Sequence, residues 1–239
     1  MSDLGRALRR MRCLHEHDER VRRGADPGPG DPAAWVTEEV VPIPKNIYGV
    51  TKFAGESVCE LFARKRHLSL IVLRTSRFFL EEDDDPEIRA KYSVVNAQAN
   101  ELLYRRVDLE DVVDAHLPAL GKARTIGFGR YIISATTPFT RNDLAELAQN
   151  APAVVNRLFP DCQALFRARG WTPFPHIDRV YVNDLARADL GWRPKHDFQH
   201  VLDCLRAKTD FRSSLACEVG RKGYHEEVFA EGPYPVAST

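Results

Sequence analysis

The segment NIYGVTKFAGE, residues 46–56, places a phenol and an ammonium four residues apart, at Tyr48 and Lys52. Residues i and i+4 of a helix are neighbours on one face. A tyrosine hydroxyl titrates near about pH 10, and a nearby ammonium favours the phenolate and lowers that pKa. Such a phenol can exchange a proton with a substrate hydroxyl or carbonyl near neutral pH, and the lysine has further donors for a ribose hydroxyl. Taken alone, the pair also fits a half-buried tyrosine beside a solvated lysine.

A helix from Asn46 to about Arg66 is predicted to hold this pair. Asn46 is a suitable N-cap, and basic residues in the last turn suit the helix dipole. Apolar residues recur at helical spacing and form one stripe, which consists of Ile47, Val50, Ala54, Val58, Leu61 and Phe62. The pattern predicts that this stripe is buried, while the neighbouring ridge with Tyr48 and Lys52 faces a cleft.

The segment LSLIVLRTS, residues 68–76, follows the helix and is nearly all apolar over its first six residues. Such a short run is typical of a strand buried on both faces of a parallel sheet. A helix followed by a buried strand is half of an α/β crossover. A later helix begins after Asp108, and Pro118 within it predicts a kink or an end there.

Three segments occur in a defined order: KNIYGVTKFAGE at 45–56, VDLEDVVDAHLPAL at 107–120 and DLGWRPKHDF at 189–198. Over roughly residues 36–208 they resemble the extended short-chain dehydrogenase/reductases, and more narrowly the NAD(P)-dependent epimerase/dehydratase family of nucleotide-sugar enzymes. The resemblance implies an α/β fold with an incomplete doubly wound, Rossmann-like parallel sheet and a smaller, mainly helical C-terminal substrate domain. The expected division is 36–135 for the Rossmann-like part and 136–239 for the substrate domain and tail.

The resemblance also implies roles for four residues. Tyr48 corresponds to the catalytic acid/base, and Lys52 corresponds to the lysine that binds the nicotinamide ribose and lowers the pKa of the tyrosine. Ser76 is expected to contact the cofactor and Arg77 the substrate, because the segment after the buried strand lines both. Ligands of open α/β sheets bind beyond the carboxyl ends of the strands, which agrees with that placement. The implied cofactor is NAD or NADP, and the implied substrate is a sugar or nucleotide-sugar-like molecule.

The chain departs from the family pattern upstream of the tyrosine. It contains no Gly-x-x-Gly-x-x-Gly turn for the cofactor pyrophosphate. The family's catalytic serine or threonine would fall in RRGADPGPG, residues 22–30, which has no hydroxyl, and Thr37 lies too close to the tyrosine. We therefore expect residues 1–35 to be a weakly ordered or non-family segment of a truncated family member, which binds dinucleotides weakly or not at all. The alternative is a non-catalytic remnant, serving as a binding or regulatory module without cofactor.

Composition narrows the classes of partner. Lys and Arg total 34, and Asp and Glu also total 34, which offers no electrostatic basis for binding nucleic acid or an anionic membrane. No apolar run reaches the roughly 18 residues of a membrane span. Five cysteines without a Cys-x-x-Cys pair indicate reduced thiols and a cytoplasmic protein. The expected partners are a small-molecule substrate and a second copy of the chain, paired through the 46–66 helix.

Two further clusters carry weaker signals. His196 and His200 are spaced i,i+4 like a metal pair, but no third ligand accompanies them in sequence, which favours surface histidines and no metal site. The acidic run EEDDD at 81–85 predicts a solvated loop rather than a cation site.

Overall fold

The computed structural model describes residues 14–15, 28, 30–44, 46–83 and 85–220. The strands are β1 (Leu14–His15), β2 (Ala34–Val36), β3 (Leu70–Thr75), β4 (Phe128–Ile133) and β5 (Arg179–Tyr181). The helices are α2 (Ile47–Arg66), α3 (Pro86–Lys91), α4 (Val94–Glu101), α5 (Leu109–Ile126), α6 (Leu144–Leu158), α7 (Cys162–Ala168), α8 (Phe198–Ala207) and α9 (Ser214–Val219), with short turns η1 (Arg141–Asp143) and η2 (Ala186–Leu190).

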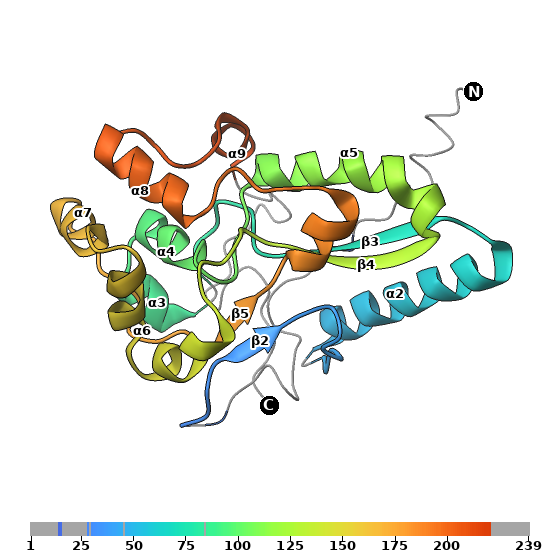
Figure 1. The fold of residues 1–239 in the computed structure, drawn as a ribbon, viewed down its shortest axis with the longest axis horizontal. Coiled ribbons are helices and arrows are strands. Elements are labelled where there is room, and N and C mark those ends of the chain that lie inside the picture. The colour runs from blue at the N-terminus through green and yellow to red at the C-terminus, as the bar shows by residue number, and fades with distance from the viewer. Residues whose placement is uncertain (1–13, 16–27, 29, 45, 84, 221–239) are drawn as a thin grey trace.

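The described strands form two parallel sheets. β1, β3 and β4 lie in that order, with Leu70 opposite Phe128 and Thr75 opposite Ile133, while β2 pairs with β5. Figure 1 shows α2 on one face of the β3–β4 layer and α5 on the other. Helices on both faces of a parallel sheet are the doubly wound arrangement, which confirms the predicted α/β fold class.

The helix and strand predicted around the Tyr48/Lys52 pair are both present. The Asn46 side chain caps α2 by accepting a hydrogen bond of 2.8 Å from the backbone N–H of Gly49. Basic residues occupy the last turn of α2, where the helix dipole favours positive charge. All six residues of β3 are buried, as its apolar sequence predicts for a strand covered on both faces.

The face of α2 that packs on the sheet is the opposite of the predicted one. The apolar stripe is exposed, with Ile47 74% and Val58 49% accessible. The residues buried against the sheet are instead Gly49, Glu56, Cys59 and Ala63. Cys59 and Ala63 pack with Leu70 and Val72 of β3, because small side chains let the helix approach the sheet closely.

The rest of the chain is mainly helical and has its own core. Buried residues of α4, α6, α7 and α8 form one hydrophobic cluster, in which the rings of Phe159 and Phe198 meet at 5.1 Å. A second cluster joins the sheet to α5, and Trp192 and Ala216 near the end of the described chain pack into it. The division into 36–135 and 136–239 stays a prediction.

Of the kink or end predicted at Pro118, the end is wrong, since α5 continues to Ile126. A proline has no backbone N–H, so the backbone carbonyl of Asp114, four residues earlier, loses one helical hydrogen bond. The side chain of Asp114 is at the surface. Among the described residues, no helix is long and apolar enough to cross a membrane.

Candidate functional site

The first two turns of α2 bring Tyr48 and Lys52 together. The ammonium nitrogen of Lys52 lies 5.1 Å from the centroid of the Tyr48 ring, within range of a cation–π interaction. Both residues are half-buried. Because α2 leads directly into β3, the two run in opposite directions, and the start of α2 lies at the end of the layer where β3 finishes (Figure 1). The pair therefore lies near the carboxyl edge of the parallel sheet.

Ser76 follows the last residue of β3 at this same edge. Its backbone N–H donates a hydrogen bond of 2.9 Å to the carbonyl of Ile133 in β4. The hydroxyl oxygens of Thr75 and Ser76 are buried, and neither has a hydrogen-bond partner among the described residues. Buried hydroxyls usually have a partner, so two unsatisfied ones at a strand end are consistent with a place where a ligand or water binds.

The side chain of Arg77, the next residue, points into a buried cluster of ion pairs and is not exposed to solvent. Its Nη1 lies 2.7 Å from Asp83 Oδ2 and 3.3 Å from Glu101 Oε1. Arg105 Nη2 lies 2.9 Å from the same two carboxylates, and Arg106 Nε lies 2.7 Å from Glu101 Oε2. Burial alone would raise the pKa of Glu101, but the charges of Arg106, Arg77 and Arg105 hold it well below its usual range.

This cluster is the part of the site that sequence reasoning missed. Asp83 belongs to the acidic run expected to be a solvated loop, yet its side chain is only 6% exposed. One sequence signal was present, because Glu101 and Arg105 have the i,i+4 spacing of a helical ion pair. The contributions of Asp83 and Arg77 could not be foreseen, since they depend on how the loop after β3 folds back.

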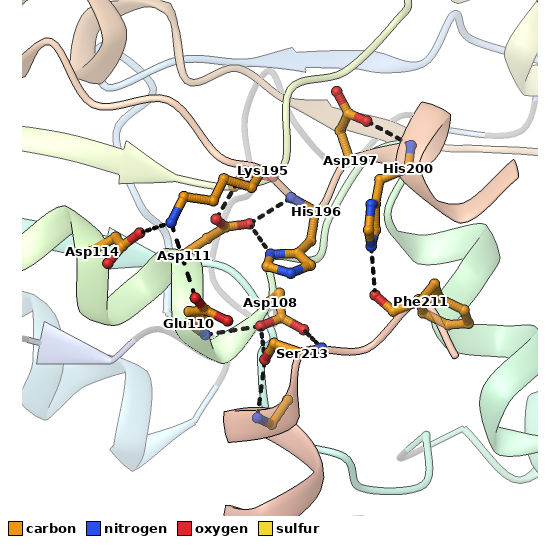
Figure 2. Close-up of polar contacts among 12 residues, drawn as sticks. Asp108, Glu110, Asp111, Asp114, Lys195, His196, Asp197, His200, Phe211 and Ser213 are labelled. Atoms are coloured by element: carbon orange, nitrogen blue, oxygen red, sulfur yellow. Dashed lines mark hydrogen bonds and ion pairs between the residues drawn. The ribbon is translucent and has the colours of Figure 1, made fainter. Parts of the chain in front are cut away.

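His196 is not a surface residue, and the metal interpretation of His196 and His200 gains no support. Figure 2 shows the carboxylate of Asp111, fully buried in α5, accepting hydrogen bonds from the backbone N–H groups of Lys195 and His196. The His196 ring lies 3.1 Å from the same carboxylate and packs edge-to-face on His200. Among the described residues, no group of three or more His, Cys, Asp or Glu side chains is arranged to hold a metal ion. These contacts fasten the chain before α8 to α5.

No protein-family model matches the chain, and no curated protein matches its sequence. Solved structures with a similar backbone trace include UDP-N-acetylglucosamine 4-epimerase from Bacillus cereus. It has 19% identity and TM-score 0.41, and the match covers 68% of this chain and 51% of that one. RMD from Pseudomonas aeruginosa complexed with NADPH has 17% identity and TM-score 0.46, covering 84% and 66%. UDP-glucose 4-epimerase from Thermotoga maritima has 20% identity and TM-score 0.43, covering 78% and 59%. The chain thus spans about half to two thirds of the length of these three proteins.

Proposed function

We propose that this chain forms part of an NAD(P)-dependent oxidoreductase of the epimerase/dehydratase type, acting on a sugar or nucleotide-sugar-like substrate. The observation that supports this most directly is the Tyr48/Lys52 pair near the carboxyl edge of a parallel sheet, with the Lys52 nitrogen 5.1 Å from the centroid of the Tyr48 ring. In this proposal residues 36–135 hold the cofactor side of the site and residues 136–239 the substrate side.

Tyr48 acts as the acid/base in this proposal, exchanging a proton with a substrate hydroxyl or carbonyl oxygen. The positive charge of Lys52 favours the phenolate, which brings the proton affinity of the phenol closer to neutral pH. The three N–H donors of Lys52 leave it able to bind a ribose hydroxyl at the same time. Ser76 offers a buried hydroxyl at the neighbouring strand end.

The described residues fit one end of a nicotinamide dinucleotide. Lys52, Tyr48 and Ser76 would hold the nicotinamide ribose and ring, and the bound nicotinamide supplies hydride transfer. The pyrophosphate end has no counterpart in the sequence, because no Gly-x-x-Gly-x-x-Gly turn is present. Weak dinucleotide binding by this chain alone is therefore part of the proposal.

Arg77 stays a candidate for substrate binding, although its guanidinium is engaged by Asp83 and Glu101. An anionic substrate group could take the place of Asp83, whereas Glu101 sits too deep to be displaced. In the proposal Arg77 therefore contacts the substrate only after the Asp83 carboxylate has moved away from it.

The missing glycine turn favours a second candidate function, a binding or regulatory module that takes the sugar substrate without a cofactor. One experiment separates the two candidates. Saturation-transfer NMR of the purified chain with NADH, NADPH and UDP-glucose shows which protons of each ligand contact the protein.

The first candidate predicts transfer to the nicotinamide-ribose protons, weakened about tenfold in Lys52→Met through loss of a charge-assisted hydrogen bond. Lys65→Met, an exposed lysine in the last turn of the same helix, should leave the signal unchanged. Transfer to UDP-glucose with none to either dinucleotide would reject the first candidate and support the second. A micromolar dissociation constant for a dinucleotide would instead reject the expected weak binding.

We further propose that the second copy expected in the sequence analysis pairs through α2. The exposed apolar stripe supports this, because Ile47, Val50, Val58 and Phe62 are each at least 48% accessible on one helix. Exposed apolar faces of that kind are typical of protein–protein contacts.

A further inference from the structure

A cavity of about 380 Å³ opens between the start of α4, the turn that follows α7 and the loop between α8 and α9. Small-molecule pockets usually have volumes of about 300–1,000 Å³, so this one is large enough for a small organic ligand. Neither Tyr48 nor Lys52 lines it, and its three segments lie on the far side of the molecule from α2 (Figure 1). The proposed oxidoreductase site therefore does not account for this cavity.

The wall of the cavity is aromatic and rigid. The rings of Trp171 and Phe211 meet edge-to-face at 6.2 Å and 89°. Phe211 and Leu205 are buried members of the helical core, and Trp171 packs against the same core. A flat apolar group can lie against such a wall without displacing any core residue, because the rings are already held in place.

The rim of the cavity is positively charged. Arg169 and Lys208 are exposed, and within the described part of the chain neither makes an ion pair. Arg212 is paired with Asp210 at 2.5 Å, so that carboxylate balances one of the three positive charges. Two positive charges remain on the rim of a chain whose acidic and basic residues are equal in number.

The backbone adds to this positive potential. α4 begins beside the cavity at Val94, its cap Ser93 lines the cavity, and its first turn contains no acidic residue. A helix amino end carries a partial positive charge that attracts anions.

Lys208 has left-handed backbone dihedrals, φ 59° and ψ 31°, which glycine adopts with less strain. A lysine at this position supplies a positive charge at the rim of the cavity, which a glycine would not.

From these contacts we infer that the cavity binds a small organic anion in which a flat apolar group carries a phosphate or a carboxylate. The flat group lies against Trp171 and Phe211. The anionic group lies among Arg169, Lys208 and the amino end of α4, where charge-assisted hydrogen bonds are the strongest available.

Titration calorimetry of the whole chain tests this with four probes: phenyl phosphate, benzoate, inorganic phosphate and benzyl alcohol. Phenyl phosphate should bind more tightly than inorganic phosphate, which lacks the ring, and more tightly than benzyl alcohol, which lacks the charge. Benzoate shows whether a carboxylate suffices. Equal binding of phenyl phosphate and inorganic phosphate, or of phenyl phosphate and benzyl alcohol, would overturn the proposal, and so would the absence of binding by both aromatic anions.

Two variants place the binding in this cavity. Arg169→Gln removes one rim charge at an exposed position, and Lys208→Gly removes the other while suiting the left-handed backbone. Each should weaken phenyl phosphate binding roughly tenfold, as expected for losing a hydrogen bond to a charged group. Arg167→Gln, an exposed arginine of α7 outside the cavity, is the matched control. Unchanged binding by both rim variants, or an equal loss in the control, would contradict the assignment.

Discussion

Tyr48 and Lys52 are one helical turn apart, and the proposed acid/base role depends on that spacing. The Lys52 ammonium lies 5.1 Å from the centroid of the Tyr48 ring, within range of a cation–π interaction. The phenol is half-buried and the ammonium is held near the same strand end as two unsatisfied hydroxyls. Single substitutions of these two residues should therefore separate a catalytic role from a packing role.

Tyr48→Phe keeps the ring and removes the ionisable hydroxyl. In a protein that joins this chain to a dinucleotide-binding half and shows turnover, we expect kcat to fall by roughly 10²-fold or more, the usual range for a lost acid/base group. Thermal unfolding should change little, because the ring still packs. Lys52→Met should raise the basic pKa of the pH–rate profile, since the charge favouring the phenolate is gone. Near-normal turnover by Tyr48→Phe would rule out the acid/base role.

The cysteines differ enough in environment to give a second prediction at this scale. Burial and the neighbouring charge of Asp161 raise the pKa of the Cys162 thiol to about 12, whereas Cys217 is exposed. Only thiolates react quickly with alkylating reagents. Brief treatment of the folded chain with iodoacetamide at pH 7.5 should modify Cys217 well before Cys162, as peptide mass spectrometry would show. Cys217→Ser is the control, and early modification of Cys162 would contradict its burial.

At the scale of elements, α2 is held to the sheet by charge as well as by small apolar residues. Glu56 is buried, and its carboxylate accepts hydrogen bonds from Arg74 of β3, at 3.0 and 2.8 Å, and from Arg130 of β4 at 3.2 Å. Glu60, one turn later, pairs with the same Arg130 but is 37% exposed. The helix α2 thus carries two glutamates that pair with arginines of the sheet, of which Glu56 is buried and Glu60 is exposed.

Replacing Glu56 by Gln should destabilise the fold strongly, because it leaves Arg74 buried beside a neutral partner. The expected loss in the free energy of unfolding is about 3 kcal/mol, the lower end for breaking a buried ion pair. Glu60→Gln should cost less than about 1 kcal/mol, as surface pairs do. Urea unfolding of both variants measures the difference. Equal losses would mean that the buried position of Glu56 has no special effect.

The exposed stripe of α2 gives a prediction for assembly. Val58→Asp places a charge in the middle of the stripe, which should convert a dimer into a monomer in light scattering after size exclusion. Its stability should change little at equal monomer concentration, because Val58 is 49% exposed and belongs to none of the hydrophobic clusters of the described residues. Val113→Asp, an equally exposed valine on α5 across the sheet, should leave the dimer intact. A monomeric unmodified chain would contradict the proposed pairing.

At the scale of the whole molecule, Asp111 and His196 connect the sheet layer to the C-terminal helices (Figure 2). Burial lowers the pKa of His196, but the hydrogen bond and charge of Asp111, with the charges of Asp108 and Glu110, outweigh burial and raise it. A raised pKa means that the folded state binds the proton more tightly than the unfolded state. This contribution to stability is therefore complete below the unfolded value, about 6.5, and is lost as pH rises through the folded pKa.

His196→Asn keeps a neutral donor near Asp111 and cannot titrate. The free energy of unfolding of the unmodified chain should therefore fall between pH 6 and pH 8 by more than that of the variant. Urea unfolding at several pH values measures both slopes. His176→Asn, which alters an exposed histidine elsewhere, is the control. Identical slopes for the unmodified chain and His196→Asn would remove His196 from the pH dependence.

The sequence alone determined the elements that depend on short-range signals. The cap at Asn46, the basic last turn of α2 and the apolar run at 70–73 in β3 each act within a few residues. Helix, strand and the Tyr48/Lys52 pair were therefore all predictable. The parallel α/β class followed from the order of these elements.

Only the tertiary structure decided which face of α2 is buried. Helical periodicity showed an apolar face and a face opposite it, and the more apolar one was the wrong choice. The partners that settle the matter come from elsewhere: Arg74 lies 18 residues and Arg130 74 residues beyond Glu56. The same holds for the Glu101 cluster, since Arg77 reaches it across 24 residues. Buried charges are stabilised by partners that the fold brings together from distant parts of the sequence. A local sequence pattern therefore cannot predict those partners.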